Sequence, residues 1–246
     1  MNFLENFKNK NLIIAHRGFR DFYVENSLDA LINSSKNSDF IELDIQFTKD
    51  YTAIIHHDET LERMSNIHMY QNYKDLKPWY IKDFNYKEIE NLDIKGTNIS
   101  TLEEFLEIAK KKDIYFNLEI KQMSKDTNKI EAIDIIINLI EKYDCSKYVL
   151  FSSFNHEYLK LINKYNKKYS IAVLDENIKR EKLLSYLKDL NAQTYNINKE
   201  LVDETLIRKL KKEGIETLVY TINDKKIIDK LFKKGVKGVF TDYPYE

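Results

Sequence analysis

The sequence predicts an α/β protein folded as a (β/α)8 TIM barrel with a small inserted subdomain after the second strand. Short apolar runs rich in Ile, Val, Tyr and Phe alternate with longer segments of helical period, which is typical of a parallel sheet. Eight such runs fall within 246 residues, which matches a barrel in strand number and chain length. A doubly wound open sheet is the alternative, but it usually has fewer strands, and no Gly-rich turn for a dinucleotide follows the first run.

Each predicted strand is a short apolar run, and each predicted helix is a longer segment with apolar residues three or four positions apart. In chain order, the strands are residues 11–16, 40–47, 114–120, 148–153, 170–174, 193–198, 216–221 and 238–241. The helices are residues 26–36, 100–112, 127–143, 155–165, 179–190, 199–213 and 223–235. A Ser-Thr pair followed by two Glu residues predicts a capping box where the second of these helices begins.

Two parts of the chain depart from the repeating pattern. Residues 48–99 are too long for one loop between a strand and a helix, so residues 58–99 are predicted to form a small insertion within a single domain, residues 1–246. Residues 52–57 before it are predicted to be a short extra strand. No helical pattern follows the last strand, and residues 3–10 are predicted to form a helix that covers part of that gap.

Composition excludes several classes of protein. A formal net charge of −1 gives no basic field for nucleic acid. The single cysteine, Cys145, excludes an intramolecular disulfide framework and a thiol-rich metal site. No apolar run is long enough for a membrane span, and the N-terminus lacks the pattern of a signal peptide, so a cytoplasmic protein is predicted.

Carboxylates interrupt two of the apolar strands. In FIELDIQF, residues 40–47, Glu42 and Asp44 share one face because successive side chains of a strand point to opposite sides. The same alternation pairs Glu119 with Lys121. Like charges buried side by side require a cation or hydrogen-bond donors. A solvated face with ordinary salt bridges is the alternative, which the apolar flanking residues disfavour.

In a TIM barrel the active site forms at the carboxyl ends of the strands, where these charged residues fall. Carboxylates without cysteine favour one hard cation, Mg²⁺ or Ca²⁺, so Glu42, Asp44 and Glu119 are candidate metal ligands. His16 and His57 flank that position and suit general acid and base catalysis near neutral pH.

Arg17 and Lys121 suit an anionic group, most simply a phosphate. Together with the metal ligands and histidines, they indicate metal-assisted cleavage of a phosphodiester. The remaining histidines, His56, His68 and His156, are interpreted as structural. Asp58 is interpreted as an orienting hydrogen-bond partner or a loop anchor rather than a ligand.

Motifs along nearly the whole chain resemble the glycerophosphodiester phosphodiesterase family. AHRG (15–18) and ENS (25–27) are similar to its HRG and ENT elements, ELD (42–44) to its acidic pair, and HHDETLERMSN (56–66) to its HD-x-T-L-x-R segment. The later elements follow in the same order as ISTLEEFLE (99–107), NLEIK (117–121), SSF (152–154), VYTIN (219–223) and GVFTDYP (238–244). Each string is short, but the ordered set is specific.

The resemblance implies hydrolysis of a small-molecule glycerophosphodiester to sn-glycerol 3-phosphate and an alcohol. It assigns the cation, the acid/base pair and the phosphate contacts to the residues named above. It also implies attack of the glycerol 2-hydroxyl on phosphorus, giving a cyclic phosphate that water opens. Tyr220 stands where the family has a Trp that lines the substrate.

Two other functions are weighed against this one. A phospholipase D-like reaction on lysophospholipids would be favoured by an exposed apolar rim on the insertion, built from Met69, Tyr70, Trp79, Tyr80 and Ile81. A non-catalytic binding module should have lost a histidine or a metal carboxylate, and all of them are present.

Overall fold

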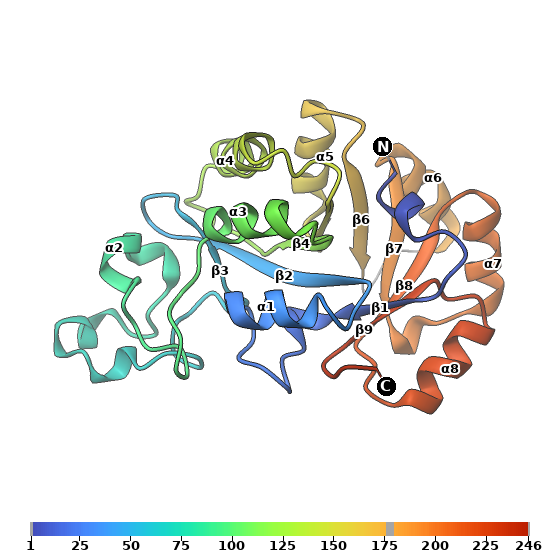
Figure 1. Cartoon of the computed structure of the whole chain (residues 1–246). Helices are drawn as coiled ribbons and strands as arrows, with labels where there is room; N and C mark the ends of the chain where they lie inside the picture. Colours follow the sequence, from blue (N-terminus) through green and yellow to red (C-terminus); the bar gives the residue numbers. More distant parts are fainter. Residues whose placement is uncertain (1, 176–179, 246) are drawn as a thin grey trace.

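A computed structural model describes residues 2–175 and 180–245. Eight parallel strands close into a barrel in the order β1-β9-β8-β7-β6-β5-β4-β2, and β2 pairs with β1 to complete the ring (Figure 1). They are β1 (Leu12–Ala15), β2 (Phe40–Phe47), β4 (Phe116–Ile120), β5 (Val149–Ser153), β6 (Ser170–Asp175), β7 (Ala192–Asn198), β8 (Glu216–Tyr220) and β9 (Gly238–Thr241). The predicted TIM barrel is therefore confirmed.

A helix lies in each segment where the sequence predicts one. The helices are α1 (Leu28–Ser34), α3 (Leu102–Lys112), α4 (Lys129–Lys142), α5 (His156–Tyr165), α6 (Leu183–Asp189), α7 (Glu204–Lys212) and α8 (Lys225–Lys233). The capping box of α3 uses Thr101 and Glu104. Position 179, where the helix before β7 is predicted to begin, lies outside the described residues.

The structure shows no helix, within residues 2–175 and 180–245, with the length and hydropathy needed to cross a membrane. The cytoplasmic location remains a prediction from the sequence.

The alternation of side chains along the strands separates an apolar outside from a polar inside. Leu43 and Leu118 point outward and belong to one hydrophobic core with Phe105 of α3 and Ile133 of α4. The residues that alternate with these two leucines along β2 and β4 therefore point into the barrel. Charged groups at these inward positions are shielded from water by the strands themselves.

The N-terminal segment closes the amino end of the barrel. Phe3–Phe7 forms a 3-10 helix, and the Phe3 and Phe7 rings pack on Phe40 at centroid distances of 5.1 and 5.6 Å. The backbone N–H of Phe3 donates to Ser170 Oγ at 3.0 Å. The predicted helical turn is present, but it fills the apolar floor of the barrel instead of the place of an eighth helix. No helix follows β9 in the part of the chain described up to Tyr245.

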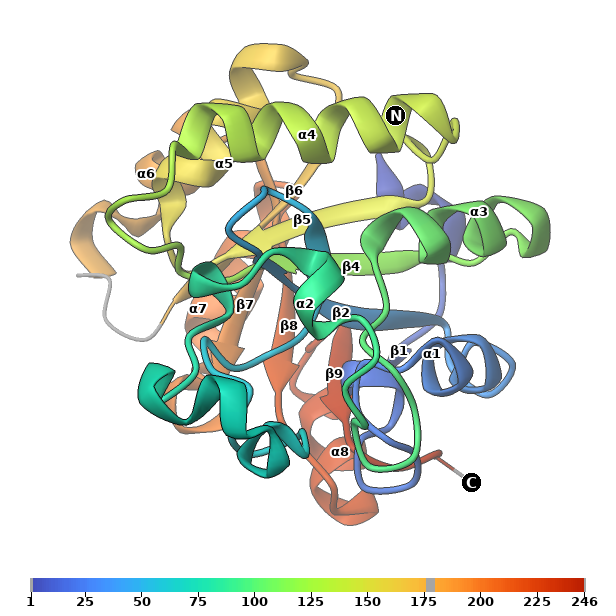
Figure 2. The ribbon, with the colours of Figure 1, turned by 90° about the vertical axis from the view of Figure 1, so that its left-hand side faces the viewer.

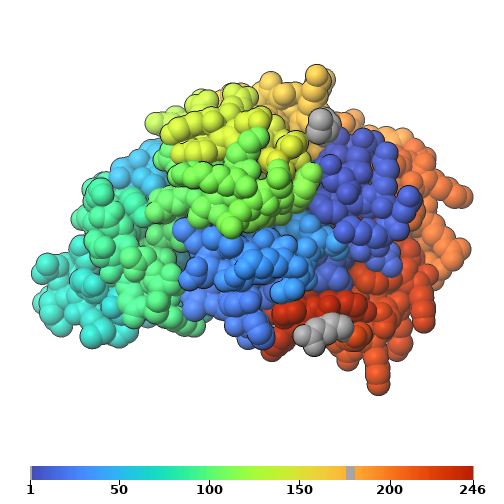
Figure 3. Space-filling model, viewed as in Figure 1, coloured from blue at the N-terminus to red at the C-terminus, as the bar shows by residue number. Residues whose placement is uncertain are grey.

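The segment after β2 forms a lobe on the side of the barrel where that strand ends. β3 (Ala53–Ile55) pairs with β2 in the antiparallel direction, and 3-10 helices at Ile67–Met69, Gln71–Leu76 and Ile81–Asp83 and the short α2 (Tyr86–Ile89) follow. Figure 2 looks onto this side, and Figure 3 shows the lobe projecting from the molecule. Its side chains form a separate hydrophobic cluster around Leu61, Trp79 and Phe84.

Candidate active site

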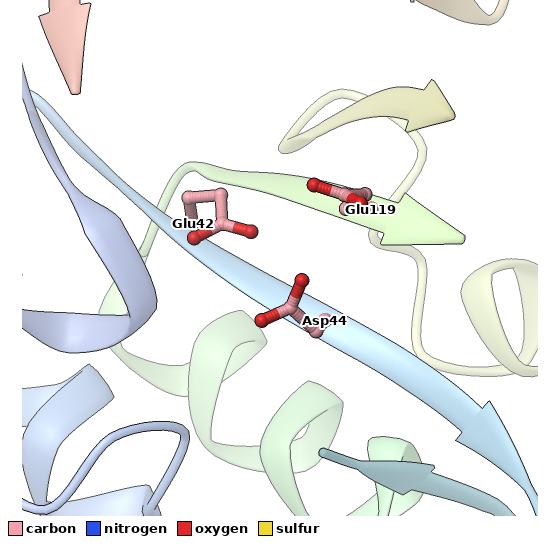
Figure 4. Close-up of side chains that lie close together, drawn as sticks. All are labelled: Glu42, Asp44 and Glu119. Carbon is pink, nitrogen blue, oxygen red and sulfur yellow. The ribbon is translucent and has the colours of Figure 1, made fainter. Parts of the chain in front are cut away.

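Three carboxylates meet inside the barrel on two neighbouring strands. Asp44 of β2 pairs in register with Glu119 of β4, and Glu42 lies two residues earlier on β2 (Figure 4). One oxygen from each carboxylate lies within 4.8 Å of the others. Glu42 is 3% exposed, and its Oε1 has no hydrogen-bond partner among the described residues. A buried carboxylate oxygen left without a donor beside two other carboxylates fits the oxygen donor set of a hard divalent cation.

Two other carboxylate oxygens of this cluster accept hydrogen bonds from the loop after β1. The Arg17 backbone N–H donates to Glu42 Oε2 at 2.8 Å. Asn26 donates from Nδ2 to Asp44 Oδ2 at 2.9 Å and accepts from the Asp44 N–H at 3.3 Å. These bonds fix β2 against the loop after β1, and they orient the carboxylates before any ligand binds.

Two cationic side chains face this acidic group. Lys121 Nζ donates to Glu119 Oε1 at 2.7 Å and lies 3.5 Å from Asp44 Oδ1. Arg17 Nε lies 3.3 Å from Asp44 Oδ2, and Arg17 Nη1 donates to Glu25 Oε1 at 3.2 Å. Arg17 lies in the turn directly after β1 and has a left-handed backbone conformation (φ 49°). Three carboxylates and two cations thus share one buried space.

The pKa values of the two carboxylates on β2 are shifted in opposite directions. Burial, together with the neighbouring Asp44 and Glu119 carboxylates, raises the pKa of Glu42 well above its usual range. Burial also acts to raise the pKa of Asp44, but the Lys121 and Arg17 cations overcome it and hold that pKa below its usual range. Burial and Asp44 raise the pKa of Glu119. A bound cation would favour the ionised form of all three groups.

His16 follows β1 and is oriented by the other end of the chain. Its Nδ1 lies 2.6 Å from Asp242 Oδ1, and Asp242 is itself bound by Asn223 Nδ2 at 2.8 Å and lies 2.9 Å from Arg20 Nε. Burial lowers the pKa of His16. Because Nδ1 is engaged, Nε2 is the ring nitrogen left for proton transfer.

His57, in the segment that follows β3, has a similar partner. Its Nδ1 lies 2.7 Å from Asp58 Oδ1. The adjacent His56 is 5% exposed, and its Nε2 lies 3.2 Å from the carbonyl oxygen of Thr60. The two neighbouring histidines therefore have different surroundings, in line with the interpretation of His56 as structural.

The predicted site residues converge on one hollow of about 220 Å³ at the carboxyl ends of the strands. Asp44 does not line it but lies beside Glu119 and Lys121, which do. The lining residues are His16, Arg17, Arg20, Glu42, His57, Asn117, Glu119, Lys121, Ser152, Phe154, Leu174, Tyr220, Thr221 and Phe240.

Several residues that organise this site received no role from the sequence. Asp242 orients His16, Asn26 holds Asp44, and Arg63 joins Glu25 to Asp58. Each lies inside one of the short motifs quoted from the sequence, which was the available signal. The contacts themselves depend on closure of the barrel and on the position of the insertion.

A closed parallel barrel with two histidines, two cationic side chains and an acidic cluster at its carboxyl end defines the class of a TIM-barrel enzyme with a candidate metal centre. The profile of the glycerophosphoryl diester phosphodiesterase family matches residues 16–246. The chain belongs to this family.

Individual relatives match this chain over most of their length. The glycerophosphodiester phosphodiesterase of Caldanaerobacter subterraneus subsp. tengcongensis is 32% identical over 96% of this chain and 95% of the relative. A solved glycerophosphoryl diester phosphodiesterase from Silicibacter pomeroyi, described as putative, is 19% identical with a TM-score of 0.86, covering 98% and 94% of the two chains. An Oleispira antarctica phosphodiesterase solved with its product sn-glycerol-3-phosphate is 24% identical with a TM-score of 0.82, covering 94% and 93%.

Proposed function

We propose that the protein hydrolyses glycerophosphodiesters to sn-glycerol 3-phosphate and an alcohol, with one divalent cation, Mg²⁺ or Ca²⁺, held by Glu42, Asp44 and Glu119. The observation that carries this proposal is the single hollow in which the acidic cluster, two cationic side chains and two histidines meet. Membership of the family and the product bound in the Oleispira relative support the same reaction.

His16 and His57 form the acid/base pair of this proposal. Each imidazole has its Nδ1 within 2.7 Å of a carboxylate, which fixes the tautomer and leaves Nε2 to move the proton. One histidine takes the proton of the attacking hydroxyl, and the other returns a proton to the oxygen of the leaving alcohol. We assign no order to the two, because both have the same kind of support.

The negative charge of the phosphate is balanced by two cationic side chains, Arg17 and Lys121, and by the metal. Arg17 and Lys121 line the hollow and stabilise the negative charge that grows on the phosphoryl oxygens. When bound, the cation supplies Lewis-acid polarisation of a phosphoryl oxygen. Because Arg17 and Lys121 already contact Asp44 and Glu119, they are positioned before substrate arrives.

The size and lining of the hollow favour a glycerol group as its occupant. Tyr220 and Phe154 form one wall, with their rings edge-to-face at 6.0 Å, and the Tyr220 hydroxyl donates to the Asp175 carbonyl at 3.3 Å. Leu174 and Phe240 complete the apolar lining. A volume of about 220 Å³ suits a small polar group rather than an acyl chain.

The lysophospholipid alternative has less support from the insertion. Met69, Tyr70 and Tyr80 are exposed, but Trp79 and Ile81, which would complete an apolar rim, are buried in the cluster of the lobe. The alternative therefore lacks the continuous apolar surface that it requires.

A second hollow suits the alcohol side of the diester. It measures about 620 Å³ and shares Glu119, Lys121 and Phe154 with the first, so the two meet where the phosphate is proposed to bind. Its other lining includes the polar side chains of Gln122 and Lys160. Neither His16 nor His57 lines it, so the arm that carries the attacking hydroxyl belongs in the first hollow.

Glycerophosphocholine and lysophosphatidylcholine differ only by an acyl chain, so they test the substrate class directly. We expect kcat/KM for glycerophosphocholine to exceed that for lysophosphatidylcholine at least tenfold, with choline released by both. A preference for the acylated substrate would favour the lysophospholipid reaction instead.

A further inference from the structure

Arg63 in the insertion bonds two carboxylates at once. Its Nε donates to Asp58 Oδ2 at 2.6 Å. Its Nη1 and Nη2 donate to Glu25 Oε2 and Oε1 at 2.8 and 2.6 Å, which is a two-pronged contact. The planar guanidinium, with donors at fixed angles, is suited to holding two carboxylates in one geometry.

Each of these carboxylates continues to a different part of the proposed catalytic machinery. Asp58 Oδ1 lies 2.7 Å from His57 Nδ1, and Glu25 Oε1 accepts from Arg17 Nη1 at 3.2 Å. The result is an unbroken chain from His57 through Asp58, Arg63 and Glu25 to Arg17. Glu25 comes from the loop after β1, and Arg63 comes from the lobe after β3.

We propose that Arg63 is a positioning residue that fixes the proposed acid/base His57 relative to the proposed phosphate-binding Arg17. The inference rests on the proposed phosphodiesterase function and gives the insertion a part in it. Arg63 does not line the 220 Å³ hollow, so it acts through Asp58 and Glu25 rather than on substrate.

Loss of Arg63 would disturb both ends of this chain. Asp58 would lose its partner at Oδ2, so the carboxylate that orients His57 could turn. Glu25 would keep Arg17 as its remaining cationic partner and would compete more strongly for that guanidinium with Asp44 and the phosphate. Because Arg63 is 45% exposed, its ion pairs add little to stability, whereas a shift of about 1 Å in a catalytic group costs up to ~10²-fold in rate.

The kinetic test compares Arg63→Gln, Arg63→Lys and the control Arg208→Gln, which breaks an exposed ion pair with Glu204 on α7. We expect Arg63→Gln to lower kcat by about 10- to 100-fold. KM should change less than kcat, and the cation concentration for half-maximal activity and the unfolding midpoint should stay near wild type. Arg63→Lys should recover only part of kcat, because an ammonium keeps the charge but lacks the fixed, planar set of donors of the guanidinium. A kcat within twofold of wild type for Arg63→Gln would overturn the proposal.

A double-variant cycle separates positioning from general damage. If Arg63 acts through Asp58, adding Asp58→Asn to Arg63→Gln should cost little beyond the larger single effect. Two fully additive losses would contradict a shared path to His57.

A readout without substrate distinguishes failure of this inference from failure of the proposed function. The His57 ring resonances in ¹H–¹⁵N NMR should shift or broaden in Arg63→Gln and should match wild type in Arg208→Gln. Unchanged His57 resonances in Arg63→Gln would reject the positioning role, even if the wild-type protein releases no glycerol 3-phosphate.

Discussion

Replacing Glu42 by Gln should stabilise the metal-free protein while it removes the response to a divalent cation. Gln keeps the shape of the side chain and the oxygen that accepts from the Arg17 N–H, but it removes one negative charge. That charge is buried beside Asp44 and Glu119, within 4.8 Å at the nearest oxygens. At this distance and an effective dielectric of about 20, two unit charges repel by about 3.5 kcal/mol.

Most of this repulsion is offset by Arg17 and Lys121, which lie beside the same carboxylates. We therefore expect a net gain of about 1–2 kcal/mol in the unfolding free energy of metal-free Glu42→Gln near neutral pH. The gain should grow with pH. Because the native pKa of Glu42 is raised, ionisation above the unfolded value of about 4.3 destabilises wild type but not the variant.

Urea unfolding in the presence of a chelator, and again with Mg²⁺ or Ca²⁺, measures both effects. A cation at 100 times its Kd should add about 2.7 kcal/mol to wild type and little to Glu42→Gln, so the order of stability reverses between the two conditions. Glu107→Gln, which removes an exposed carboxylate paired with Lys111, is the matched control and should change neither value by more than about 0.5 kcal/mol. If Glu42→Gln were less stable with chelator and still responded to the cation, the account of the acidic cluster would be refuted.

Three further predictions concern the histidines, the alcohol side and the cysteine. His57→Ala should lower kcat by about 10²- to 10⁴-fold with the fold retained in circular dichroism, whereas His56→Ala should cost about 1–3 kcal/mol of stability through its buried bond and leave kcat within about threefold. Equal loss of turnover in both variants would contradict the assignment of acid/base catalysis to His57 and not to His56. Lys160→Glu should shift relative kcat/KM from glycerophosphoglycerol towards glycerophosphocholine by about three- to tenfold. The control Lys164→Glu, one turn further along α5 and outside the second hollow, should cause no such shift. Identical substrate profiles in the two variants would contradict binding of the alcohol group in the second hollow. Burial raises the pKa of Cys145 to about 11, so a thiol reagent at pH 8 should label it only after unfolding in urea, and fast labelling of the native protein would contradict its buried position.

The acidic cluster and the barrel were predictable because both follow from short periods in the sequence. Glu42 and Asp44 share a face by strand alternation alone, and Glu119 joins them because the next parallel strand of the barrel lies beside β2 in matching register. The apolar residues between these carboxylates face the helices for the same reason.

Asp58 adjoins His57 in the sequence and was interpreted there as an orienting partner or a loop anchor, but the other orienting partners were not predictable, because they are remote in the sequence. Asp242 meets His16 across 226 positions, only because β9 pairs with β1 and closes the barrel. Arg63 meets Glu25 because the insertion folds back over the loop after β1, and no local pattern specifies that contact.

Local signals also failed where tertiary packing or a cap decided the outcome. The N-terminal turn is helical as predicted, but its phenylalanines are buried in the floor of the barrel, which a sequence period does not locate. The helix predicted over 199–213 begins as α7 only at Glu204, because the Asp203 side chain accepts from the N–H groups of Thr205 and Leu206 and caps it there.

Metal-dependent hydrolysis at the hollow that holds the acidic cluster and the two histidines is tested most directly by one assay. Purified protein is incubated with glycerophosphocholine and with glycerophosphoglycerol, with Mg²⁺ or Ca²⁺ and with a chelator, and sn-glycerol 3-phosphate is measured. We predict release that the chelator abolishes and that one of the two cations restores. No release with either cation and either substrate would contradict the account.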